Sequence, residues 1–307
     1  MTTLRVKHID AFTNSPFAGN PAGVVLNAEG LRDDLMQRIA REMNLSETAF
    51  VLPPNRPEAD IRIRWFTPTH EVPLCGHATV AAFHALAQEG LAGMKTNGQH
   101  YFRVETGSGV LAVKVEKNFR GIGVEFQLPL PAFRIKRALP VILFQLLGIR
   151  RSDVAPGLPV VTDRDLYLPV KRLQVLQTMR PHFQELVRWC TRARLTGVCV
   201  FTLQARDKSG SVHSRFFAPA VGINEDPVTG SANGPLGVYL KTFAGKAGYE
   251  VPCRLLPDGR VEYVGEQGDE IERPGRVKIR LRMQDDRVED VSIAGEAVTV
   301  WSAAIQL

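Results

Sequence analysis

Two loops of the chain end in small-residue segments that are expected to start helices. The first is CGHA at residues 75–78, and the second is TGSA at residues 229–232. A helix start presents unpaired backbone N–H groups and the positive end of the helix dipole, and Gly76 and Gly230 would let a ligand approach closely. Two such starts could hold a carboxylate. One such motif alone favours an ordinary capped helix, with Ser231 or Thr229 as N-cap, whereas two copies at matched positions favour a binding site.

Glu47 lies in the segment NLSETAFV, between an expected helix end and an apolar strand. A carboxylate that enters a buried strand has a raised pKa if water is excluded, which suits a general acid or base. Its counterpart in the internal repeat described below is Gly197, so only one half carries a carboxylate there. A salt-bridged or capping glutamate at a strand edge explains Glu47 without catalysis, and both interpretations stay open on this feature.

His77 and Asp226 are two further polar candidates. His77 stands at the first helix start, and Asp226 lies in NEDPVTGS just before the second. An Asp-Pro pair at a loop-to-helix junction commonly orients the turn. A histidine at a helix start can equally be a satisfied structural residue. Taken singly, each residue is compatible with a structural role and with a place in a binding site.

Other chemistries lack their motifs. The segments 107–109 and 121–123 each lack the third glycine of a dinucleotide loop, and no phosphate-binding loop is present. His70-Glu71 opens no zinc motif, since the next histidine is His77. The four cysteines have no CxxC spacing. The sequence therefore predicts neither a metal site nor a cofactor, and thiols that are reduced in a cytoplasm.

Composition narrows the class of protein. With 44% apolar and 23% charged residues in 307, the chain has the balance of a globular protein of two domains. The net charge is +6, but the basic residues are scattered, which argues against nucleic acid as a partner and fits attraction of an anionic substrate. No apolar run approaches the roughly 18 residues that span a bilayer. The first ten residues read as a strand, so a signal peptide is not expected.

The elements that must position these residues form an internal repeat. RWFTP at residues 64–68 matches RFFAP at 215–219, and each is followed by an irregular loop and one of the two helix starts. Before each match the order is strand, helix, strand, with the second-half helix expected as one piece over 173–190. A duplicated α/β unit is the simplest interpretation. The Pro-rich and basic segment 129–160 is interpreted as the connection between the halves.

Four segments together carry a family resemblance: FAGNPAG, NLSETAF, CGHAT and EDPVTGSA. In this order they resemble the PhzF-like phenazine biosynthesis family, nearly end to end. The resemblance implies an α+β protein of the diaminopimelate epimerase-like fold, with two pseudo-symmetric α/β halves and the active site in the cleft between them. It also implies that the C-terminal end of the chain crosses back to the N-terminal half. The N-terminal half would then consist of residues 1–128 and 298–307, and the C-terminal half of residues 129–297.

The same resemblance implies roles for the candidate residues. Glu47 would transfer the proton, and His77 and Asp226 would complete the catalytic group by positioning the substrate and holding Glu47 in the right protonation state. Ser231 would line the site, and backbone amides at the two glycine helix starts, Gly76 and Gly230, would hold the substrate carboxylate. The implied activity is a cofactor-free isomerisation of the trans-2,3-dihydro-3-hydroxyanthranilate type, by a cytoplasmic homodimer that acts on a small carboxylated amino acid.

Alternatives remain. Epimerases of this fold resemble two-base enzymes with a cysteine at each helix start, whereas this chain has Cys75 in the first half and Thr229 in the second. A hydroxyl is too weak an acid or base for that task, which argues against two-base racemisation and leaves Cys75 as a small residue that fits the turn. A racemase or dehydratase on the same fold is the second candidate. A non-catalytic small-molecule-binding protein is the third, and the intact candidate residues argue against it.

Overall fold

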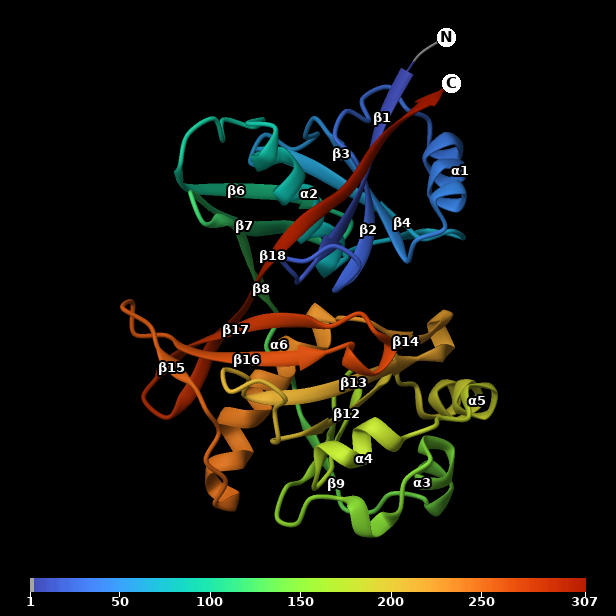
Figure 1. Cartoon of the computed structure of the whole chain (residues 1–307), viewed down its shortest axis with the longest axis vertical. Helices are drawn as coiled ribbons and strands as arrows, with labels where there is room; N and C mark the ends of the chain where they lie inside the picture. The colour runs from blue at the N-terminus through green and yellow to red at the C-terminus, as the bar shows by residue number, and fades with distance from the viewer. Residues whose placement is uncertain (1–2) are drawn as a thin grey trace. The chain divides into compact units, whose positions relative to one another are not determined.

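The computed structural model describes residues 3–307, and the chain divides into two compact units (Figure 1). Unit 1 consists of Met1–Gln127 and Ala294–Leu307, and unit 2 of Leu128–Ile293. The predicted divisions after residues 128 and 297 lie close to these positions. The last strand, β18 (Arg287–Gln306), runs through the second division without a break. No helix within residues 3–307 is long and apolar enough to cross a membrane.

Unit 1 is a mixed sheet with two helices. Its strands pair in the order β18, β1, β2, β3, β4, β6, β7, β8, and β5 pairs beside β4. The bounds are β1 (Thr3–Ala11), β2 (Asn20–Val25), α1 (Asp33–Met43), β3 (Glu47–Leu52), β4 (Ile61–Phe66), β5 (Glu71–Val72), α2 (Gly76–Gln88), β6 (Gly98–Thr106), β7 (Gly109–Asn118) and β8 (Gly121–Leu128).

The two helices of unit 1 differ because their sequences differ. Helix α1 is amphipathic, and it buries Met36, Ile39 and Ala40 against β-strand residues such as Phe50 and Phe66. Helix α2 is alanine-rich, and every residue from His77 to Ala87 is buried. A helix with small, apolar side chains on every face is typically buried inside its unit. The N-terminus of α2 therefore also lies in the interior of unit 1.

Unit 2 repeats this pairing. Its strands follow the order β9, β10, β11, β12, β13, β16, β17, with β14 beside β13 and β15 beside β16. The bounds are β9 (Arg134–Lys136), α3 (Val141–Leu147), β10 (Val160–Thr162), β11 (Leu166–Pro169), α4 (Leu173–Thr178), α5 (Phe183–Ala193), β12 (Val198–Thr202), β13 (Val212–Ala218), β14 (Ile223–Asp226), α6 (Gly230–Tyr239), β15 (Arg254–Leu255), β16 (Val261–Gln267) and β17 (Gly275–Gln284), with short 3-10 turns at Arg151–Asp153, Pro219–Val221, Gly245–Ala247 and Asp269–Ile271 and a π turn at Leu240–Ala244.

Two expectations about unit 2 are wrong. The segment 129–160 is not a plain connection, because it supplies β9, α3 and the start of β10 to the unit. The helix expected over 173–190 is divided into α4 and α5. Met179 takes an extended ψ of 139° and ends α4. Pro181 disfavours helical geometry at Arg180, the residue before it, and has no N–H to continue a helix.

The internal repeat is confirmed at the level of strand register. In unit 1, β2 runs parallel to β3, and Thr48 on β3 lies opposite Phe66 on β4. In unit 2, β11 runs parallel to β12, and Val198 lies opposite Phe217 on β13. Thr48 and Val198 are therefore equivalent, and so are the residues before them, Glu47 and Gly197.

The repeat extends to side-chain contacts. The Arg64 guanidinium donates two hydrogen bonds to Glu71, of 2.7 and 2.6 Å, across β4 and β5. The Arg215 guanidinium donates two to Glu225, of 2.8 and 2.7 Å, across β13 and β14. Such bidentate pairs hold the short return strand that leads to each buried helix, so the matched RWFTP and RFFAP segments have one structural role in both units.

The first and last strands, β1 and β18, lie side by side in unit 1 (Figure 1). Strand β18 pairs antiparallel with β1 from Thr3 opposite Gln306 to Ala11 opposite Ala297, with one irregularity after His8. The prediction that the C-terminal segment returns to the N-terminal half is confirmed.

Candidate active site

Glu47 is the first residue of β3 and is placed there by the end of α1. The helix stops at Asn44, which takes the left-handed conformation with φ of 49° and turns the chain toward the sheet. Strand β3 then pairs parallel with β2, with Ala22 beside Glu47. The Glu47 side chain keeps only 12% of its surface exposed. The predicted position of Glu47 at the entry to a buried strand is thus confirmed.

Cys75 and His77 come from the start of α2. Cys75 is the N-cap residue, in an extended conformation, and its carbonyl oxygen accepts a 2.6 Å hydrogen bond from the Thr79 hydroxyl. His77 lies in the first turn and is buried. Because α2 is buried all round, both side chains are held inside unit 1.

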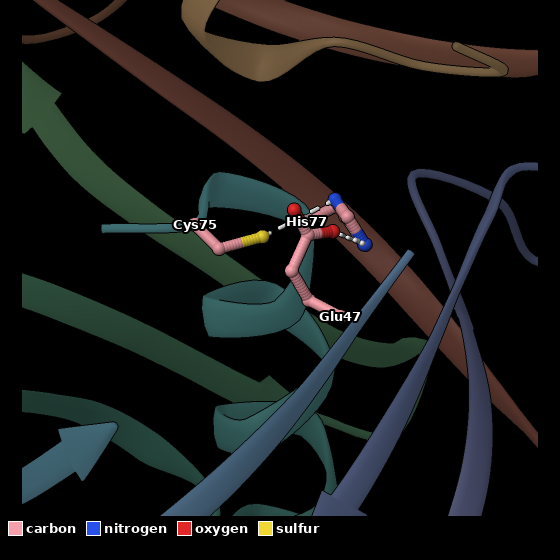
Figure 2. A group of neighbouring side chains, drawn as sticks. All are labelled: Glu47, Cys75 and His77. Atoms are coloured by element: carbon pink, nitrogen blue, oxygen red, sulfur yellow. Dashed lines mark hydrogen bonds and ion pairs between the residues drawn. The ribbon is translucent and has the colours of Figure 1, made fainter. Parts of the chain in front are cut away.

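The three side chains meet in one cluster (Figure 2). The Nε2 atom of His77 lies 3.4 Å from Glu47 Oε2 and 3.2 Å from the Ser46 hydroxyl. The other ring nitrogen, Nδ1, lies 3.4 Å from the Cys75 sulfur. An imidazole with its proton on Nε2 would donate toward Glu47 and Ser46 and would leave Nδ1 facing the Cys75 sulfur.

The electrostatics of Glu47 suit proton transfer. Burial raises the pKa of Glu47, although hydrogen bonds from Ser46 and Cys75 and the charge of His70 act in the opposite direction. Glu47 Oε2 is enclosed by protein and has no hydrogen bond of good geometry among the described residues. A carboxylate that is incompletely solvated is a stronger base than one in water, so Glu47 is suited to remove a proton from carbon.

The cluster also bears on metal binding. One ligand atom from each of Glu47, Cys75 and His77 lies within 4.8 Å of the others, a grouping that sequence spacing did not reveal. However, Cys75 faces Nδ1 of the ring and Glu47 faces Nε2 (Figure 2). The lone pairs of these nitrogens diverge, so one ion could not bind His77 and both neighbours without a rotation of the ring. In this arrangement the groups fit proton transfer better than metal binding.

The second-half candidates are all in unit 2. Asp226 ends β14 and accepts a hydrogen bond from the Thr229 hydroxyl, and the Gln267 side chain binds both Thr229 and the Asp226 carbonyl. These contacts fit the turn-orienting interpretation of Asp226. Gly230 begins α6 and is buried, as expected. That Asp226, Gly230 and Ser231 serve the same substrate as Glu47 stays a prediction.

Packing explains why unit 2 has a glycine, Gly197, at the position that Glu47 occupies in unit 1. A Cβ atom at Gly197 would lie 2.5 Å from the ring of Phe216 and 2.8 Å from the carbonyl oxygen of Phe217. No side chain fits there without displacement of the strand. The aromatic ring in unit 2 therefore occupies the space that a carboxylate would need.

Sequence reasoning did not assign Ser46 a role, although it lies within the NLSETAF segment. Its hydroxyl contacts His77 and lowers the pKa of Glu47. A serine beside a candidate acid or base was the available signal, but the side-chain direction depends on the turn out of α1.

The site and fold can be compared with known proteins. The family model described as phenazine biosynthesis-like protein matches residues 9–303. An uncharacterized isomerase from Clostridium acetobutylicum is 35% identical, and the alignment covers 97% of both chains. The uncharacterized isomerase YddE of Escherichia coli K12 is 36% identical, with 99% of both chains covered.

Solved structures of known proteins have the same fold as this chain. A PhzF family protein of Bacillus anthracis superposes with a TM-score of 0.86 at 33% identity over 100% of both chains. A probable proline racemase from Agrobacterium radiobacter matches with a TM-score of 0.61 at 12% identity, over 99% of this chain and 93% of the other, a likeness of fold alone. These matches confirm the predicted fold class.

Proposed function

Because the chain belongs to the phenazine biosynthesis-like (PhzC-PhzF) family and is an isomerase of that family, we propose that it shifts a proton within a small carboxylated amino acid that is cyclic or unsaturated. The observation that carries this proposal is the buried Glu47 carboxyl, with a raised pKa, in contact with His77. No cofactor takes part in the proposed reaction.

Glu47 transfers the proton in two steps. Its carboxylate removes a proton from one carbon of the substrate, and the electron pair of the broken C–H bond moves into the conjugated system as the double bond shifts. The neutral carboxyl then returns the proton to a different carbon, so the product has the same atoms as the substrate. Burial helps the first step because it weakens solvation of the carboxylate, and it makes the neutral intermediate state accessible.

His77 holds Glu47 in place. His77 Nε2 lies 3.4 Å from Glu47 Oε2, and it makes a 3.2 Å hydrogen bond with the Ser46 hydroxyl. The Cys75 sulfur contacts the other ring nitrogen, Nδ1, and so limits rotation of the ring. In the proposed mechanism His77 orients Glu47 and does not touch the migrating proton.

The substrate class follows from the resemblance to PhzF-like enzymes. A compound of the trans-2,3-dihydro-3-hydroxyanthranilate type has a carboxylate, an amine and a ring double bond that can move. We propose that Asp226, Ser231 and the backbone amides at Gly76 and Gly230 bind its polar groups. The homodimer expected from the resemblance and the cytoplasmic location expected from the cysteine pattern remain part of this proposal.

Proton NMR in D₂O tests the reaction. Dihydrohydroxyanthranilate and related cyclic amino acids are incubated with the enzyme in the presence of EDTA. We expect turnover with partial deuterium incorporation, because a proton held by one carboxyl exchanges with water only when the site opens before the proton returns. Activity that is lost with EDTA, or that requires added nicotinamide or flavin, would refute the cofactor-free proton shift.

A further inference from the structure

Unit 2 contains a buried carboxyl group that the sequence analysis did not single out. Asp165 lies one residue before β11 and is only 2% exposed. Its Oδ1 atom is fully enclosed and has no hydrogen-bond partner among the described residues. A carboxyl oxygen in this state is costly, and each such group in a native protein calls for an explanation.

Asp165 lies at a position related to that of Glu47. Leu166 pairs with Val198 across the parallel strands β11 and β12, which sets Asp165 beside Gly197. In unit 1, Ala22 lies beside Glu47 across β2 and β3. In each unit, a carboxyl residue therefore lies beside a small residue where the parallel pairing begins. In unit 1 the carboxyl is on the second strand of the pair, and in unit 2 it is next to the first.

The face of the strand that carries Asp165 packs against α6. Tyr167 is two residues further along, on the same face, and its hydroxyl donates to the carbonyl oxygen of Ala232 at 3.4 Å. Ala232 belongs to the first turn of α6. Asp165 thus lies toward the start of α6 in unit 2, as Glu47 lies toward the start of α2 in unit 1.

Arg164 connects Asp165 with that helix start. Its Nε atom lies 3.7 Å from Asp165 Oδ2, and its Nη2 group donates a 3.1 Å hydrogen bond to the Ser231 hydroxyl. The Arg164 side chain is 59% exposed. A guanidinium has five N–H donors, so several remain for a ligand after these two contacts.

We propose that Arg164 is a specificity-determining residue that binds the carboxylate of the substrate at the first turn of α6, with Asp165 as the residue that positions it. The guanidinium adds a bidentate donor to the helix N-terminus and the Ser231 hydroxyl, and this combination selects a planar anion over a neutral amide. The inference deepens the function proposed above, because it names the residue that requires the substrate to be an acid.

The charge on Asp165 would change the affinity of Arg164 for an anion. Burial raises the pKa of Asp165 to about 6, against the charge of Arg164 and a hydrogen bond from the backbone of Gly197. The other charged group acting on Asp165 is Asp163, while Tyr167, Cys190 and Cys199 have raised pKa values and stay neutral near pH 7. Protonation of Asp165 removes a negative charge beside Arg164, so anion binding should tighten as the pH falls below about 6.

Binding of a simple acid tests the proposal without turnover. Acetate and its neutral analogue acetamide are titrated separately into the full-length, ¹⁵N-labelled protein, and the amide signals of Gly230 and Ser231 are followed. We expect saturable shifts with acetate and none with acetamide. Arg164→Gln should weaken acetate binding about 10-fold, the loss typical of a charge-assisted hydrogen-bond pair. Arg192→Gln, at an exposed arginine of α5, is the matched control and should bind acetate as wild type does.

The pH dependence separates positioning from a purely structural role. Between about pH 7.5 and 5.5, acetate binding by the wild type should tighten, and in the isosteric Asp165→Asn variant it should not change. Arg164→Lys should recover part of the affinity. The proposal is wrong if the two amides do not respond to acetate, or if Arg164→Gln binds acetate as tightly as wild type. Neither result bears on proton transfer by Glu47, which is measured by turnover.

Discussion

At the scale of single residues, the proposed chemistry depends on the carboxyl group of Glu47. We predict that Glu47→Gln lowers kcat about 100-fold or more, the usual contribution of a general acid–base group. The amide has the same shape but cannot accept the proton. Steady-state kinetics on the substrate found by NMR measure the loss. More than about a tenth of wild-type activity would refute acid–base catalysis by Glu47.

The same substitution should not destabilise the protein. Because burial raises the pKa of Glu47, the charged form is less favourable in the folded state than in the unfolded state. That cost is absent at low pH and present above the folded pKa. The melting temperature of Glu47→Gln minus that of wild type should therefore be larger near pH 8 than near pH 4, as thermal unfolding at both pH values would reveal.

Cys75 should contribute less than Glu47. Its sulfur lies 3.4 Å from His77 Nδ1, so its expected role is to support the imidazole ring. We predict that Cys75→Ser keeps most of the activity and that Cys75→Ala loses at most about fivefold, the worth of one neutral hydrogen bond. Rate assays of both variants decide the matter. A loss as large as that of Glu47→Gln would instead favour a thiol-based epimerase.

At the scale of elements, packing between β12 and β13 excludes a side chain at Gly197. We predict that Gly197→Ala costs about 1–3 kcal/mol, the usual range for overpacking, because the added Cβ would meet Phe216 and the backbone of Phe217. Gly245→Ala is the control, since its Cβ would have open space and its φ is −61°. Urea unfolding of both variants gives the comparison, and equal stability would show that β12 shifts freely.

Strand β13 also carries a buried ionic group at His213. Burial lowers the pKa of His213, but hydrogen bonds to Glu266 and Glu270 outweigh it and raise the value to about 9. Because this folded-state pKa lies above the ordinary histidine value of 6.5, the charged imidazole stabilises the fold below about pH 6.5, and this contribution is lost as the pH rises through about 9.

The prediction for this network is a stability difference that depends on pH. Wild type should melt well above His213→Gln at pH 6.5, and the difference should shrink as the pH rises toward 10. Both proteins are followed by thermal unfolding across that range. A constant difference would show that His213 contributes by packing alone.

At the scale of the whole molecule, the last strand ties the end of the chain to its beginning. Removal of residues 298–307 takes away the partners of β1 from Thr3 to Asp10. We predict a melting temperature lower by at least about 5 °C, because a ladder of hydrogen bonds worth about 1 kcal/mol each is lost with its packing. Removal of Leu307 alone is the control. A shortened chain that melts like the full-length protein would mean that β18 is peripheral to unit 1.

Local patterns determined much of this protein. The matched segments at residues 64 and 215 predicted the repeat, because the same short strand and arginine pair recur in both units. Small residues around Gly76 and Gly230 predicted the starts of α2 and α6, because both segments follow the matched strands at similar distances. The proton-transfer candidate was also accessible, since a carboxylate at the entry of an apolar strand is a local signal.

Tertiary structure decided the rest. Glu47 and His77 are 30 residues apart in sequence, and only the burial of α2 beside β3 brings their atoms to 3.4 Å and raises the pKa of Glu47. Asp165 gave no signal, because a polar residue in a turn is ordinary until its neighbours exclude water from it. Burial and side-chain direction arise from contacts between distant segments, and one sequence contains no direct record of those contacts.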